Sequence, residues 1–187
     1  MFDLIRREVQ DKATYLEFVE SQEMQNRADI ESVWAELIPK ESGINYAGFD
    51  EVANSPTAFQ LDWQYSNGES PNFRERLFSR LSNLNNRQRF MFAEARRQLS
   101  STNNAKKIYL YEMVTDFFRE FNNACGNDYE VTGSEYLGHD KVGGQEYQGI
   151  RHEDALALSF SDNSIDLIIS NDVFEHVPDI KKSFQEL

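Results

Sequence analysis

The sequence predicts an α/β fold in which parallel strands alternate with helices, preceded by a helical arm and an irregular region. Two observations predict it. From residue 106 onward, short apolar stretches alternate with a helical pattern, which is typical of a parallel sheet wound by right-handed crossovers. Upstream, residues 1–38 have helical spacing, and glycine and proline interrupt residues 39–85. We therefore expect an N-terminal part over residues 1–104 and a sheet domain over residues 105–187.

The composition of the chain argues for a folded protein and against several classes of partner. The chain has 187 residues, of which 40% are hydrophobic and 27% charged, so a folded core is expected. A net charge of −13 argues against nucleic acid or an anionic membrane as the partner. One cysteine excludes an intramolecular disulfide. Without a signal peptide or an apolar run near 18 residues, the expected location is the cytoplasm.

One stretch is locally basic despite the acidic total. Seven arginines lie between residues 74 and 97. They could meet an anionic small-molecule acceptor, but a surface that pairs with acidic neighbours is the favoured interpretation.

The N-terminal arm has apolar residues at steps of three and four, which predicts one long helix. These residues are Ile5, Val9, Leu16, Val19 and Met24. Asp29 offers a cap for a second helix, which Pro39 would end.

Residues 39–104 contain three stretches of different expected structure. Short strands and loops are expected over residues 39–85, including the aromatic stretch 59–63. Asn85 or Asn86 can cap a helix that runs to about Leu99, and the polar residues 100–104 form the connector to the sheet domain.

The sheet domain has four expected strands. They lie at residues 108–111, 129–132, 150–152 and 165–169, with a helix from Thr115 to about Ala124 and a glycine-rich loop over 138–149. Pro178 is expected to open a last helix that contains Ile180 and Phe184.

Polar side chains follow each of the four strands. They are Glu112, Glu135, Asp154, and the pair Asn171 and Asp172. Ligands of open parallel sheets bind outside the carboxyl ends of the strands. We therefore expect these groups to lie at one edge and to accept hydrogen bonds from a ligand.

The run from Glu153 to Asp179 resembles the type 11 S-adenosylmethionine (SAM) dependent methyltransferases. An acidic residue after the third strand, a turn, an Asp on the fourth strand and then Glu-His-Val follow at the family's spacing. The resemblance implies a partial class I methyltransferase fold, which is Rossmann-like with strand order 3-2-1-4-5-7-6, and SAM as the cofactor.

The resemblance also implies roles for single residues. Asp154 would accept from the adenine amino group, Ala155 would line the adenine pocket, and Glu135, followed by Tyr136, would hold the ribose hydroxyls. Such an enzyme mainly aligns an already activated methyl donor with its acceptor.

The remaining strand-end residues complete this expected site. Glu112 keeps the acidic end of the first strand, and Asn171 and Asp172 would close the pocket over the sulfonium. His176 is a candidate general base, although a role in fixing the start of the last helix is preferred. The methyl acceptor is not specified beyond a small molecule.

Three features depart from the family pattern. The turn after the first strand, residues 112–117, has no glycine, and the glycine-rich segment 138–149 does not replace it. Only four of seven strands are present, so we expect a truncated product, or a homo-oligomer formed through the exposed sheet edge or the N-terminal helices.

The third departure lies upstream. Residues 72–75 and 84–89 resemble a segment that carries a Cys-x-x-Cys knuckle in some relatives. Here the corresponding positions are Ser79 and Ser82, with an earlier pair at Asp50 and Ala53. Serine and alanine do not replace thiolates on zinc, so no structural metal is expected.

Two alternatives remain open. A non-catalytic remnant of such an enzyme could serve as a binding or oligomerisation module. A nicotinamide-binding domain ranks last, because Gly-x-Gly-x-x-Gly is absent after the first strand.

Overall fold

The centre of the sheet domain is a parallel sheet of three strands in the order β4-β3-β7, seen in a computed structural model that describes residues 9–101 and 106–187. The strands are β3 (Lys107–Leu110), β4 (Glu130–Gly133) and β7 (Leu167–Ile169). β3 pairs with both neighbours in parallel. This is the 2-1-4 part of the expected order, so the partial Rossmann-like α/β fold is confirmed.

The third expected strand is short and lies beside the end of β4. β5 (Glu146–Tyr147) and β6 (Ile150–Arg151) form an antiparallel pair. One residue later, His152 makes a parallel bridge to Glu135. The strand order along this edge therefore continues as 3-2-1-4.

β3 is buried along most of its length because helices cover the sheet. In α4 (Asp116–Cys125) the apolar residues Phe117, Phe121 and Cys125 recur every four positions and are buried. The Thr115 hydroxyl begins this helix by accepting the backbone N–H of Phe118. The expected helix at this place is confirmed.

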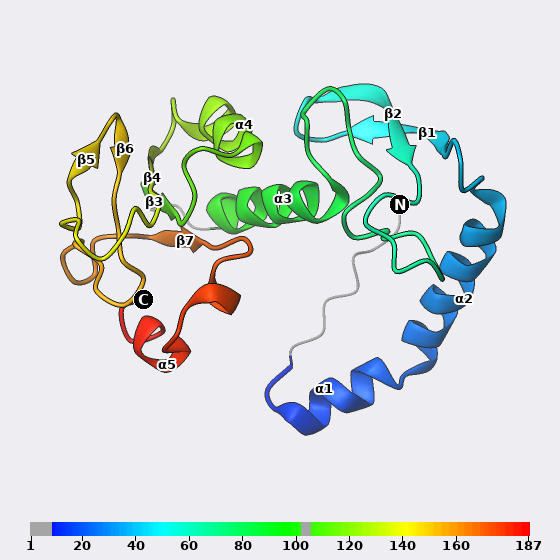
Figure 1. Cartoon of the computed structure of the whole chain (residues 1–187), viewed down its shortest axis with the longest axis horizontal. Coiled ribbons are helices and arrows are strands. Elements are labelled where there is room, and N and C mark those ends of the chain that lie inside the picture. Colours follow the sequence, from blue (N-terminus) through cyan, green and yellow to red (C-terminus); the bar gives the residue numbers. More distant parts are fainter. Residues whose placement is uncertain (1–8, 102–105) are drawn as a thin grey trace.

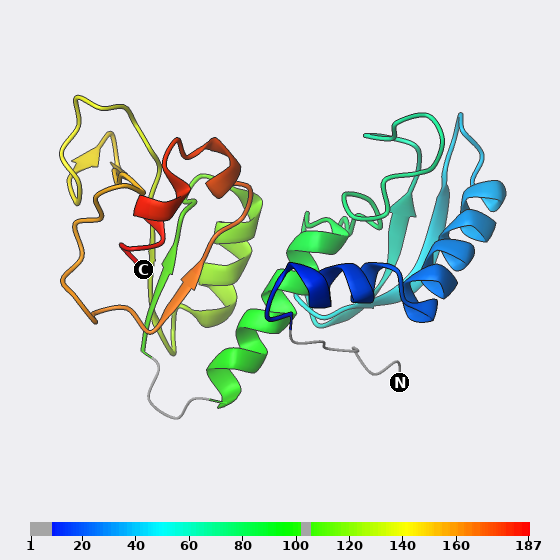
Figure 2. The same cartoon turned by 90° about the horizontal axis from the view of Figure 1, so that it is seen from below.

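α3 (Asn86–Ser101) packs into the same core, although it precedes the expected boundary at residue 104. Its Phe92 ring meets Phe121 of α4 edge-on, with ring centroids 5.6 Å apart. Figures 1 and 2 show α3 between the β1–β2 hairpin and the parallel sheet. The helix thus connects the N-terminal part to the core of the sheet domain.

The irregular region contains an antiparallel hairpin of β1 (Ile44–Asp50) and β2 (Ser55–Leu61). Phe78 adds a bridge to Gln60 of β2. The expectation of short strands and loops here is confirmed.

The helical arm divides elsewhere than expected. α1 (Lys12–Val19) and α2 (Gln22–Leu37) are separated at Ser21, whose hydroxyl caps α2 by accepting the Met24 N–H. The prediction of one helix through Met24 and a second begun by Asp29 was wrong, since Asp29 lies inside α2. A serine cap outweighed the continuous apolar spacing. Ile5 lies outside the described residues.

The C-terminal elements are shorter than expected. After β7 come a 3-10 turn, η1 (Phe174–His176), and α5 (Ile180–Ser183), which Asp179 caps through the Lys182 N–H. β7 begins at Leu167 rather than 165. Asp166 instead accepts the N–H groups of Lys106 and Lys107, at 2.8 and 2.9 Å, and so ties the starts of β7 and β3 together. Within the described ranges, no helix is both long enough and apolar enough to span a bilayer.

Candidate functional site

A cavity of about 390 Å³ lies beyond the carboxyl ends of the parallel strands. Four residues expected at the site line it: Tyr136, Asp154, Ala155 and His176. Seven others complete the lining: Tyr111, Ser134, Glu153, Leu156, Val173, Val177 and Pro178. Glu112, Glu135, Asn171 and Asp172 do not line it. The expected site residues therefore divide into a group at the cavity and a group around it.

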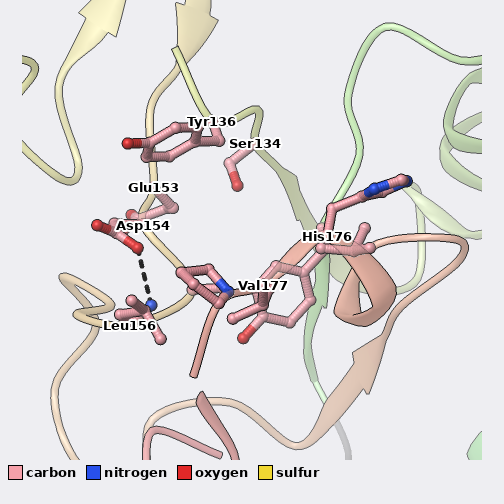
Figure 3. A pocket seen from close by; sticks show the side chains of 11 residues that line it. Ser134, Tyr136, Glu153, Asp154, Leu156, His176 and Val177 are labelled. Carbon is pink, nitrogen blue, oxygen red and sulfur yellow. Dashed lines mark hydrogen bonds between the residues drawn. The ribbon is translucent and has the colours of Figure 1, made fainter. Parts of the chain in front are cut away.

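Asp154 sits at one side of the cavity in a tight turn. Its Oδ1 accepts the Leu156 N–H at 2.9 Å, and its backbone carbonyl accepts the Ala157 N–H, also at 2.9 Å. Figure 3 shows the first bond and places Asp154 near Tyr136 and Glu153. One local hydrogen bond therefore orients the Asp154 carboxylate, and a second closes the turn.

Glu153 is a site residue that sequence reasoning missed. Its carboxylate, 1% exposed, accepts from Arg151 Nη2 at 2.6 Å and from the Ser159 hydroxyl at 2.6 Å and N–H at 2.9 Å. These bonds hold both ends of the 153–159 loop, which carries Asp154 and Ala155. The alternation of Arg151 and Glu153 was the available signal, because residues two apart share one face of a strand.

Glu135 stabilises the turn after β3. Its Oε1 accepts the N–H groups of Met113 and Val114 at 2.8 and 3.0 Å. This turn is the one that lacks glycine. A carboxylate that follows the neighbouring strand β4 therefore holds the backbone of this turn.

Glu112 is not part of the cavity lining and is 5% exposed. Burial raises the pKa of Glu112, and the Thr115 hydroxyl and the Asn171 side chain only partly offset this. Glu112 Oε1 and Asn171 Oδ1 are both buried and lack a hydrogen-bond partner among the described residues. Two acceptor oxygens without donors thus lie at the ends of β3 and β7.

Asp172 is not among the residues that line the cavity, and its carboxylate binds two arginines of the N-terminal part. Its carboxylate pairs with Arg87 at 2.6 Å and with Arg74 at 3.3 Å. Its backbone is left-handed, with a φ of 54°. The structure therefore places this acid in an ion-pair network rather than over the pocket.

Most arginines of the basic stretch contact other side chains of the same chain. Arg76 forms a buried pair with Asp62, Arg87 also binds Glu75, and Arg97 binds Glu94. Arg89 lies over the Phe59 ring, 3.9 Å from its centroid. The favoured interpretation of the arginines as partners of acidic neighbours agrees with these contacts.

Aromatic side chains form the inner wall of the site. The hydroxyl groups of Tyr109 and Ser134 are 2.6 Å apart, and the Tyr109 ring packs on Tyr111. Burial raises the pKa of Tyr111 to about 12, so its phenol stays protonated at neutral pH. Figure 3 shows the His176 ring on the opposite side from Tyr136 and Asp154. Of the lining residues, His176 is the only histidine.

The model of one protein family matches residues 111–187, and its description is "Methyltransferase domain". The matched region begins at Tyr111 and includes every expected site residue. No curated protein and no solved structure matches the chain significantly.

Proposed function

Residues 111–187 belong to the methyltransferase domain family of class I, SAM-dependent enzymes, and from this premise we propose that the chain binds SAM in the strand-end cavity and transfers its methyl group. The observation that carries the proposal is the cavity itself, which lies beyond the parallel strands inside the matched region. In sheets of this kind that is where ligands bind.

The residues present fit the cofactor in two respects. SAM carries a sulfonium cation, and the cavity lining contains the Asp154 carboxylate but neither lysine nor arginine. SAM also carries donor groups, and the buried oxygens Glu112 Oε1 and Asn171 Oδ1, which lie at the strand ends outside the cavity lining, lack donors among the described residues. Asp154 and Ala155 would hold the adenine, and Tyr136 would pack beside it.

The residue expected to hold the ribose of SAM already has another role. Glu135 is the residue that would hold the ribose hydroxyls, yet its Oε1 already accepts two backbone N–H groups. A carboxylate has about four acceptor positions, so Oε2 would carry the ribose. The residue would then serve both the turn and the cofactor.

When bound, SAM supplies an activated methyl group, so the protein needs to align the acceptor and exclude water. His176 lines the cavity and can accept a proton from an oxygen or nitrogen acceptor as it is methylated. Tyr111 stays protonated at neutral pH and does not compete as the base. The proposed acceptor is a small molecule.

Isothermal titration with S-adenosylhomocysteine tests the proposal. The wild-type chain should bind one equivalent. D154N keeps an oxygen for the Leu156 N–H but offers an amide donor where the adenine needs an acceptor, so binding should weaken by about 10- to 200-fold, equivalent to about 1–3 kcal/mol. D162N, in an exposed turn, is the matched control. Wild-type affinity in D154N would remove this site assignment.

One observation favours a second candidate, a binding or oligomerisation module. α1 and α2 contain no buried residue, and they expose Leu16, Val19, Ile30, Val33 and Leu37. Such apolar surface is typical of a helix that meets a partner. A stable oligomer on light scattering, together with no binding of S-adenosylhomocysteine, would favour this function over catalysis.

A further inference from the structure

Two turns outside the methyltransferase domain share one geometry. In the first, Asp50 Oδ1 accepts the N–H groups of Val52 and Ala53 at 2.9 and 3.2 Å. In the second, Ser79 Oγ accepts those of Leu81 and Ser82 at 3.2 and 3.5 Å. In both turns the first side chain therefore binds the third and fourth backbone amides.

The turns also end in the same way. The fifth residue of each is an asparagine with left-handed backbone, Asn54 with φ 48° and Asn83 with φ 56°. Asparagine tolerates this conformation better than most residues. The repetition of hydrogen bonds, spacing and left-handed residue shows two copies of one local structure.

The two turns meet through their side chains. Asp50 Oδ2 accepts hydrogen bonds from the hydroxyls of Ser79 and Ser82, the latter at 2.7 Å. All three residues are fully buried. With the two amides on Oδ1, the carboxylate accepts four hydrogen bonds, so its charge is compensated inside the protein.

This arrangement has the plan of a structural metal centre. Such centres hold two turns through ligands at the first and fourth positions of each, as in Cys-x-x-Cys pairs. The four positions here are Asp50, Ala53, Ser79 and Ser82. Ala53 has no donor atom, the hydroxyls are poor zinc ligands, and the carboxylate is already engaged, so these residues do not fit a metal ion.

We propose that the hydrogen-bonded cluster of Asp50, Ser79 and Ser82 replaces a metal ion as the link between the two turns, and that the turns still hold a tetrahedral metal when four thiolates are supplied. The link matters for the rest of the chain. The second turn closes with the Ser79 N–H donating to the Leu84 carbonyl, and Leu84 is part of the core that α3 enters. The proposal does not depend on SAM binding.

The test uses the full chain with D50C, A53C, S79C and S82C combined, titrated with Co²⁺. We expect one Co²⁺ per chain with the visible absorption of tetrahedral cobalt thiolate, and displacement by Zn²⁺. The triple variant D50C/S79C/S82C retains Ala53, and should lose the four-thiolate spectrum. The wild-type chain, whose single cysteine is buried, should give no such band.

A second measurement keeps the proposal falsifiable if the four-cysteine variant folds poorly. Refolding of that variant with Co²⁺ should restore the circular dichroism of the wild type, and the wild-type Tm should not change with a chelator. Three results would overturn the proposal: a wild-type Tm that falls with EDTA, a folded four-cysteine variant without tetrahedral cobalt, or no refolding in the presence of Co²⁺.

Discussion

Arg87 Nη2 lies 2.6 Å from Asp172 Oδ2, and this ion pair joins the start of α3 to the loop that follows β7. The two residues are 85 positions apart in the chain. Arg87 also binds Glu75, at 2.9 Å. The pair therefore fixes the loop that carries Asn171 against the N-terminal part of the protein.

We expect R87A to lower the free energy of unfolding by about 1.5–3 kcal/mol, because it removes charged hydrogen bonds from a mostly buried guanidinium. D172N keeps a residue that tolerates left-handed backbone and should cost less, about 1 kcal/mol or below, since Asp172 is half-exposed. Urea unfolding of the single and double variants gives the coupling energy. Additive losses would show that the pair contributes nothing of its own.

The hydrogen-bonded cluster of Asp50, Ser79 and Ser82 predicts that the free energy of unfolding depends on pH. Burial raises the pKa of Asp50, but hydrogen bonds from Ser79, Ser82, Ala53 and Val52 together outweigh it, and the pKa is lowered from 3.8. Folding therefore favours the ionised form. The stabilisation is present above about pH 4 and is lost as the pH falls through the lowered pKa.

D50N should consequently lower the free energy of unfolding by about 2–3 kcal/mol at pH 7, because an amide is a weaker acceptor for the buried hydroxyls. The difference from wild type should shrink below the pH at which Asp50 protonates. Thermal unfolding from pH 7 to pH 2.5 measures it, with the exposed-turn variant D162N as the control. A difference that is constant with pH would contradict this origin.

Glu112 predicts a pH dependence of stability that runs in the opposite direction to that of Asp50. Burial raises its pKa from 4.5, so folding favours the protonated form. The contribution of protonated Glu112 to the free energy of unfolding is present in full below about pH 4.5. It is lost as the pH rises through the raised pKa. At neutral pH the ionised group therefore opposes folding.

E112Q should accordingly raise Tm at pH 7–8, by about 2–4 °C for each kcal/mol gained in a chain of this size, and should match wild type in acid. If Glu112 also meets the donor groups of SAM, the same variant should bind S-adenosylhomocysteine more weakly. Scanning calorimetry and titration on one preparation measure both effects. A lower Tm at neutral pH would show that the ionised acid is compensated in the fold.

Substitution of Glu153 should lower the stability of the loop at the edge of the cavity. E153A leaves Arg151 and Ser159 without their shared acceptor, which should cost about 3 kcal/mol, the lower end for breaking a buried pair, since Arg151 is partly exposed. E153Q should cost less. Limited proteolysis should then cut within residues 153–160 in E153A first, and cleavage equal to that of wild type would contradict the role of Glu153 in holding the loop.

Local patterns predicted much of this fold, because they depend on neighbouring residues. Phe117, Phe121 and Cys125 mark one face of α4, and Thr115 begins it. The buried stretch around Ile108 predicted β3. The break at Ser21 was missed because apolar spacing continues across it, whereas the cap depends on a single hydroxyl.

The site was less predictable, because its contacts join distant residues. The resemblance selected Asp154 and Ala155, which line the cavity. It could not show that Asp172 pairs with Arg87, or that Glu135 holds the Met113 turn. A charged residue can pair with several others in the chain. Which partner it contacts is determined by the tertiary structure, which local sequence does not show.

Chemical-shift mapping of the ¹⁵N-labelled full chain with S-adenosylhomocysteine tests directly whether the cofactor binds in the strand-end cavity. If SAM binds in the strand-end cavity, saturable shifts should appear at the backbone amides of Tyr136, Ala155, Leu156 and Val177, which line it from three separate segments. An unchanged spectrum at millimolar ligand, or shifts confined to α1 and α2, would contradict it.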